Sequence, residues 1–223
     1  MKNFLLLFLL LCFSCKKEKF ATPVDFGYSY IPVNVGHWVI YDVDSAATDV
    51  FIKKTNRYHY QIKEYFESVF KDNQDRNTLR IERYKRDNEN QQWQIIDVWY
   101  ANKTTRTYEK VEENIRFIRL TFPVLFGTQW NGNSFTEYPP QNYSYNSVDE
   151  PSILNGVKFD STLTVMQQQK DSSLVSGDYA YEKYARNIGL IYKRFYQFRK
   201  TSVYGDTSKY IDYTYIIKEF GNN

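Results

Sequence analysis

Apolar and polar residues alternate with a period of two through most of the chain, which is the pattern of β-strands rather than helices. The clearest example runs from Arg57 to Phe70, where Tyr58, Tyr60 and Ile62 fall on one face and polar residues fall on the other. A strand of this length with one wet side is typical of an antiparallel sheet.

Polar turns separate further runs of the same kind. A hairpin is predicted at residues 45–48, between short strands at 38–44 and 49–53. Because no helical period lies between neighbouring runs, adjacent strands are expected to pair antiparallel. The remaining predicted strands cover residues 78–86, 93–100, 104–111, 115–122, 162–168, 190–198 and 209–220.

One segment favours a helix instead. Asp178 suits the N-cap position, Tyr181 and Tyr184 follow at helical spacing, and Gly189 is a typical C-terminal stop. We therefore predict a mainly β fold, with a large curved antiparallel sheet or an open or half barrel and one short helix near 178–188.

The segment 123–160 is predicted to be a long loop and the functional edge of the molecule. It holds four of the six prolines, which cannot donate hydrogen bonds to a central strand ladder. It also carries aromatic residues, among them Trp130 and Tyr138, which are too many for a solvated linker. Either these rings pack over the open end of the sheet as a lid, or they are presented to a partner.

The N-terminus has the pattern of a secretory leader. A single positive charge, Lys2, precedes eight consecutive apolar residues, and Ser14 stands directly before Cys15. The apolar run is far shorter than the roughly 20 residues of a membrane-spanning helix. The sequence therefore predicts a signal peptide at 1–14, a tether at 15–35 and a single β-rich domain at 36–223.

The end of this leader resembles the lipobox of bacterial lipoproteins, in a loose form found in the Bacteroidetes group. The resemblance implies a diacylated Cys15 and attachment to the membrane through that lipid. Lys16 is not the Asp associated with inner-membrane retention in this family, and only Glu18 is acidic in the following stretch. An outer-membrane lipoprotein that faces the periplasm is therefore expected.

A nine-residue stretch at 184–192 resembles a helix-glycine-strand element of uncharacterised periplasmic lipoproteins with curved sheets. These are loosely similar to the lipoprotein carriers LolA and LolB. The resemblance implies topology rather than activity.

Aromatic residues make up 18% of the chain, well beyond what turns and tethers need. Trp93, Trp99, Trp130 and Tyr138 are candidate contacts for a ligand or a partner, since an aromatic-lined sheet stacks on sugars or buries lipids. The alternative is that these rings only fill the core.

Charge and motif content exclude several classes of function. A net charge of +3 gives no electrostatic footprint for nucleic acid. After removal of the leader, Cys15 is the only cysteine, and His37 and His59 are too few for a metal or haem site, so no metal or cofactor is expected. Nucleophile-elbow and phosphate-loop motifs are absent from the sequence, which lowers the expectation of enzymatic activity.

Two tripeptides, starting at Asp44 and Asp160, resemble the O-glycosylation sequon of exported Bacteroidetes proteins, with Ser45 and Ser161 as acceptors. The leading functional hypothesis is a non-enzymatic, lipid-anchored envelope protein whose β-rich domain binds an envelope partner or supports an assembly. The alternatives are a carrier of a hydrophobic or lipid ligand on the concave face of the sheet, and a glycan-binding or glycan-active protein.

Overall fold

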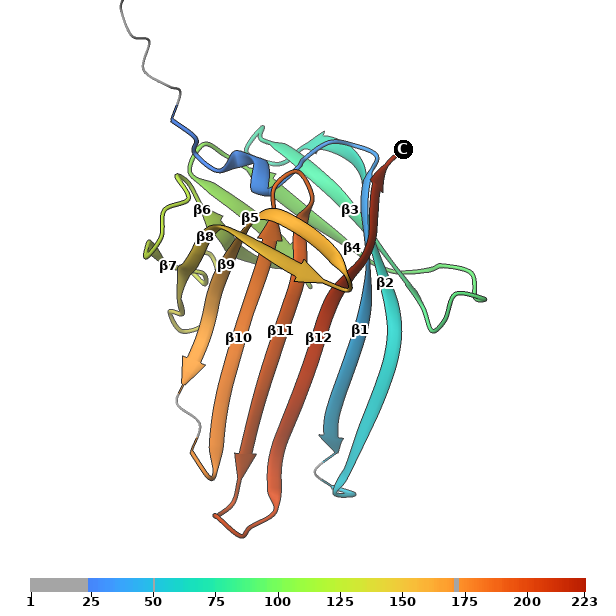
Figure 1. Ribbon diagram of the computed structural model, residues 1–223, viewed down its shortest axis with the longest axis vertical. Helices are drawn as coiled ribbons and strands as arrows, with labels where there is room; N and C mark the ends of the chain where they lie inside the picture. Colours follow the sequence, from blue (N-terminus) through green and yellow to red (C-terminus); the bar gives the residue numbers. More distant parts are fainter. Residues whose placement is uncertain (1–23, 50, 171–172) are drawn as a thin grey trace, which may run out of the picture.

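A computed structural model describes residues 24–49, 51–170 and 173–223, and nearly all of them belong to one antiparallel sheet (Figure 1). The elements are the 3-10 turn η2 (Tyr28–Tyr30) and twelve strands: β1 (His37–Asp49), β2 (Lys54–Lys71), β3 (Asn77–Arg86), β4 (Gln94–Lys103), β5 (Thr107–Glu112), β6 (Ile115–Thr121), β7 (Gln129–Asn131), β8 (Asn142–Leu154), β9 (Val157–Lys170), β10 (Ser176–Ala185), β11 (Gly189–Lys200) and β12 (Thr207–Asn222). In the described part of the chain, no helix is long and apolar enough to cross a membrane.

Two six-stranded meanders build the sheet. Their order is β6-β5-β4-β3-β2-β1-β12-β11-β10-β9-β8-β7, so the first and last long strands pair at the centre and each meander winds outward from them. This arrangement follows from short polar turns between successive strands, which place sequence neighbours side by side. The predicted mainly β fold, with a large, curved antiparallel sheet, is confirmed.

The two free edges of the sheet meet, which makes it a nearly closed, barrel-like shell. Ile118 N donates to Gly132 O at 2.9 Å, and Trp130 Nε1 donates to Ile118 O at 3.0 Å. The Tyr145 hydroxyl accepts from Thr121 N at 2.9 Å and donates to Thr121 O at 2.6 Å. A few cross-edge bonds, rather than a continuous ladder, therefore close the shell.

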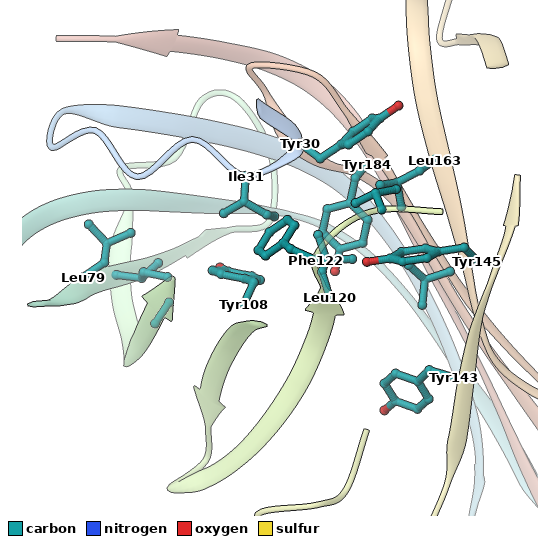
Figure 2. Close-up of a cluster of buried hydrophobic side chains, with 14 of the residues drawn as sticks. Tyr30, Ile31, Leu79, Tyr108, Leu120, Phe122, Tyr143, Tyr145, Leu163 and Tyr184 are labelled. Atoms are coloured by element: carbon teal, nitrogen blue, oxygen red, sulfur yellow. The ribbon is translucent and has the colours of Figure 1, made fainter. Parts of the chain in front are cut away.

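An apolar core fills one end of the shell (Figure 2). Tyr30 and Ile31, from η2 and the residue after it, are 0% and 3% exposed and lie among Tyr108, Phe122 and Tyr184. Residues 15–35 are predicted to be a tether, and within this segment Tyr30 and Ile31 pack into the end of the shell.

The predicted helix near 178–188 is wrong, because these residues form β10 and its turn into β11. Within the strand, Asp178, Ala180, Glu182 and Tyr184 are buried on the inner face, while Tyr181 is half-buried on the outer one. Polar groups thus occupy inner positions and an aromatic ring an outer position. The hydrophobic pattern hides the period of two for that reason.

The predicted hairpin at 45–48 is also displaced. β1 continues to Asp49, whose Oδ1 accepts from Phe51 N at 2.9 Å and Ile52 N at 3.3 Å. An aspartate that bonds its own downstream backbone is a turn-former. Asp49 therefore ends β1, and residues 51–53 form a turn in place of the strand predicted at 49–53.

The segment 123–160 is not one long loop. It contains β7, all of β8 and the start of β9, so irregular chain is limited to residues near 122–141 on either side of β7 and to the turn at 155–156. Pro151 lies in β8, where the register with β9 shifts three times and Asp149 has a φ of 58°. A bulged ladder tolerates a proline because some of its amides are unpaired in any case.

Candidate functional site

A cavity of about 570 Å³ lies inside the shell, between the apolar plug and the free ends of the long strands. Its lining runs along β1, β11 and β12 from Leu190 to Ser45 and Tyr213, toward the turns at the lower end of Figure 1. The volume falls within the ~300–1,000 Å³ of small-ligand sites.

Three carboxylates and four cations are set into the cavity wall. Each of these seven side chains is at most 16% exposed. They reach the interior from six different strands because each occupies an inward position in the alternation of its strand. They are Glu64, Glu112, Glu182, Arg83, Lys110, Arg119 and Lys193.

The first group of charges is organised around Arg119 of β6. Its guanidinium lies 2.7 Å from Glu112 Oε2 and 4.0 Å from Glu182 Oε1. Lys193 of β11 faces the same two carboxylates, with its Nζ 3.4 Å from Glu182 Oε1 and 3.9 Å from Glu112 Oε2. These contacts join β5 and β6 to β10 and β11 across the interior.

The second group surrounds Glu64 of β2. Lys110 Nζ donates to Glu64 Oε2 at 2.9 Å, and Arg83 Nε lies 3.3 Å from Glu64 Oε1. The indole of Trp99 stacks on Arg83 at 3.5 Å and lies 4.7 Å from Lys110 Nζ. The aromatic face therefore compensates part of the desolvation of both cations.

The first group stays ionised near neutral pH. Burial acts to raise the pKa of Glu112, but Arg119, Lys193 and Lys110 outweigh it and lower that pKa. Burial likewise acts against the charge of Glu182, and Arg119 and Lys193 lower its pKa. Burial acts to lower the pKa of Lys193, yet Glu112 and Glu182 raise it overall. In the buried part of the wall four cations face three carboxylates, and a fourth carboxylate, Glu113, lines the rim.

The cavity wall also presents a hydrogen-bond donor that the protein does not use. Gln167 of β9 is 7% exposed, and its Nε2 finds no hydrogen-bond partner among the described residues. Arg83 Nε, although close to Glu64, likewise forms no hydrogen bond of good geometry. Both groups are donors, so the wall is short of acceptors.

Aromatic rings surround the open side of the cavity. Phe195 and Tyr213 stack with their centroids 5.3 Å apart, and Tyr60 and Tyr215 complete this rim. All four are half-buried. A carboxyl pair, Asp97 and Glu113, lies beside Trp99: their mutual hydrogen bond raises the pKa of Glu113, which lines the rim.

The structure brings two of the four predicted aromatic contacts into this cavity. Trp99 and Tyr138 line it, and Tyr138 packs on Phe117 at 6.5 Å. Trp130 lies at the seam of the shell, 4.7 Å from the Tyr145 ring. Trp93 lies just before β4 against Arg86, and does not line the cavity.

The remaining predicted site residues have different surroundings. Cys15 lies outside the described residues. Ser45 is in β1 at the cavity mouth and half-buried. Ser161 Oγ donates to Asp149 Oδ1 at 2.5 Å and accepts from Arg186 Nε at 2.9 Å. In the described part of the chain, His, Cys, Asp and Glu side chains form no group of three that could hold a metal ion.

Sequence reasoning missed the charged wall entirely. Glu182 and Lys193 are cross-strand partners of β10 and β11, but the first was placed on a helix. A weak signal does exist, since Arg119 follows Ile115 and Phe117 on an otherwise apolar face of the strand predicted at 115–122. An isolated charge on an apolar face indicates either a partner across the core or an error in register.

Comparison with known proteins gives only distant similarity. No family model matches the chain, and no curated protein matches it. One similar solved structure is a protein from Bacteroides fragilis NCTC 9343 described as exported and as having a YmcC-like fold, with a TM-score of 0.45, 9% identity, and coverage of 89% of this chain and 100% of that one. Another, from Parabacteroides distasonis ATCC 8503, is described as a lipoprotein, with a TM-score of 0.37, 9% identity, and coverage of 90% of this chain and 100% of that one.

Proposed function

We propose that this chain is a non-enzymatic, lipid-anchored envelope protein that binds a small acidic sugar in the cavity of its barrel-like sheet. The anchor is Cys15 and the location is the outer membrane, facing the periplasm. The leader pattern at residues 1–15 supports the anchor. The cavity wall supports the ligand class.

The observation that carries the ligand class is the surplus of donors in a buried polar wall. Leaving a buried N–H without an acceptor costs about 1–3 kcal/mol, and Gln167 Nε2 is such a group. A carboxylate or phosphate on the ligand supplies acceptors, and the four buried cations of the wall favour its negative charge. A sugar ring fits beside the acid group because its apolar face stacks on rings such as Trp99 and Tyr138.

A hydrophobic ligand fits this cavity poorly. It would bury seven charged side chains under apolar surface, which removes their remaining solvation without replacing it. The aromatic rim alone suits a lipid, but the rim is the shallow part of the site.

Glycoside hydrolysis is not favoured either. That chemistry needs a protonated carboxyl acid, whereas the pKa values of both Glu112 and Glu182 are lowered. Asp97 and Glu113 are in direct hydrogen-bond contact, while the carboxyl groups of glycosidases are separated by about 5–9.5 Å to admit the sugar.

Calorimetric titration of the purified protein with glucuronic acid, a hexose phosphate and uncharged glucose tests the proposal. We expect the acidic sugars to bind and glucose to bind at least tenfold more weakly, because one charged hydrogen bond contributes about 1.5–3 kcal/mol. Gln167→Leu should weaken acid binding. Gln169→Leu is the matched control, since Gln169 is an exposed residue of β9 that pairs with Tyr179 on the outer face of β10.

The outcomes separate binding from folding. Gln167 Nε2 bonds nothing within the described protein, so Gln167→Leu is expected to keep its melting temperature. Equal binding of glucose and the acids would contradict an acidic ligand. Binding of a fatty acid, with no binding of any sugar, would favour the hydrophobic carrier instead.

A further inference from the structure

Four exposed apolar side chains gather where the described chain begins. Val24 is 75% exposed, Phe26 42%, Leu125 57% and Phe126 76%. We call them the N-terminal apolar patch. Contiguous exposed apolar surface of this kind marks an interaction site more often than chance exposure.

Backbone contacts hold the two segments of the patch together. Val124 N donates to Phe26 O at 3.0 Å, which places Leu125 and Phe126 beside Phe26. Gly27 adopts a φ of +80°, and a Cβ there would lie 2.6 Å from Val124 Cγ2, so only glycine permits this approach. The patch is therefore a built part of the plugged end.

The charges beside the patch are already paired. Asp25, between Val24 and Phe26, forms a 2.6 Å ion pair with Arg186. Lys103 Nζ donates to the carbonyl oxygens of Tyr28 and Ile31 at 2.7 and 2.8 Å. Covering this surface with an apolar medium leaves neither of these charges without a partner.

The position of the expected lipid decides which end can touch the membrane. Val24 follows Cys15 by 24 − 15 = 9 residues, which span at most about 30 Å when fully extended. β12 alone has 16 residues and extends roughly 50 Å at about 3.3 Å per residue. The turn between β11 and β12 lies at the opposite end of the molecule from the blue N-terminal segment in Figure 1. If the molecule stood with this turn against the membrane, its N-terminal segment would lie too far from the membrane for the lipid anchor to reach.

We propose that the N-terminal apolar patch lies against the lipid surface that holds the anchor. The plugged end then faces the bilayer and the cavity mouth points away from it, where a water-soluble ligand can enter. This inference rests on the lipid anchor of the proposed function. One acyl anchor with a second apolar contact also holds a protein more firmly than the anchor alone.

A single-cysteine fluorophore tests the orientation. The anchor would consume the thiol of Cys15, so a cysteine introduced at Phe126 is the only reactive thiol of the mature chain. The lipidated Phe126→Cys protein is labelled with an environment-sensitive dye and reconstituted in vesicles of phosphatidylethanolamine with a minor fraction of phosphatidylglycerol. Tyr204→Cys is the matched control, because Tyr204 is 100% exposed in the turn between β11 and β12.

We expect dye at residue 126 to shift to shorter wavelength and to be quenched several-fold more by a headgroup-proximal spin-labelled lipid than dye at residue 204. Equal quenching at both positions, or stronger quenching at 204, overturns the proposal. The same shift at 126 in a soluble variant that begins after Cys15, measured without lipid or detergent, would show that a second copy covers the patch, which also overturns it. Failure of both proteins to float with vesicles would instead contradict the lipid anchor.

Discussion

The plugged end and the open end of the shell use the same long strands for opposite purposes. At the plugged end, Tyr30 and Leu120 are fully buried and apolar side chains fill the interior (Figure 2). At the open end, aromatic rings are half-exposed on both faces of one sheet layer, with Phe195 and Tyr213 inside and Tyr181 and Tyr192 outside. The first arrangement stabilises the fold, and the second leaves surface for contacts.

The charged wall separates these two ends. Arg119, Glu112 and Glu182 lie just below the apolar plug, and their pairing ties the two meanders together. Burying ion pairs contributes little net stability compared with apolar packing. This contrast is consistent with the proposed role of the wall in ligand binding, while apolar packing at the plug and the seam stabilises the fold.

The largest expected effect follows from Arg119→Met. This change leaves Glu112 and Glu182 with less compensation in the interior, and removing one partner of a buried pair typically costs about 3–5 kcal/mol. Urea denaturation measures it. Lys53→Met, which removes an exposed pair with Asp206 at the open end, is the control and should change little. A similar loss of stability in both variants would show that the buried ion pairs of the wall matter no more for folding than the exposed pair at the open end.

The seam is expected to come next. Trp130→Ala removes the hydrogen bond to Ile118 O and the ring that packs on Tyr145, and should destabilise the fold by about 3 kcal/mol, at the low end for a buried Trp because its ring is only partly covered. Trp93→Ala, outside the cavity, should cost clearly less. A thermal melt of Trp130→Ala that matches the parent would mean that the ring is presented to a partner rather than packed as part of a lid.

The wall also predicts an acid dependence. The pKa values of Glu112 and Glu182 are lower in the folded protein than the ordinary 4.5. Their contribution is therefore present above that value and is lost as the pH falls toward their folded pKa values, from about pH 5 downward. Urea melts over this range should show a shallower slope of stability against pH for Glu112→Gln than for the parent. An identical slope in the two proteins would show that other carboxylates dominate the loss of stability in acid.

The smallest stability effect is expected at the rim. Phe195→Ala removes a half-exposed ring that stacks on Tyr213, and should cost about 1 kcal/mol, while acid-sugar affinity falls several-fold.

O-glycosylation at Ser45 stays a prediction that bears on the same rim, since a glycan there would occupy the mouth. Intact mass of protein from its native host, compared with a Ser45→Ala and Ser161→Ala variant, measures that modification. A native protein with the mass of the unmodified chain would contradict the predicted glycosylation.

The sequence by itself determined the class of fold. A period of two and polar turns are local properties, and they located most strands, including β2, β3 and β12, to within a few residues. The leader pattern is equally local. Trp99 and Tyr138 could be selected as candidates because their size and type stand out along the chain.

Only the tertiary structure decided which strands close the shell and which charges meet inside it. Lys110 and Glu64 are 46 residues apart, and nothing in either neighbourhood indicates the other. The same reason explains the false helix at 178–188: Glu182 is an inward strand residue only because Arg119 and Lys193 compensate its charge. Hydrophobic periodicity records burial against an apolar core, whereas the burial of a charge depends on partners that the closure of the sheet supplies.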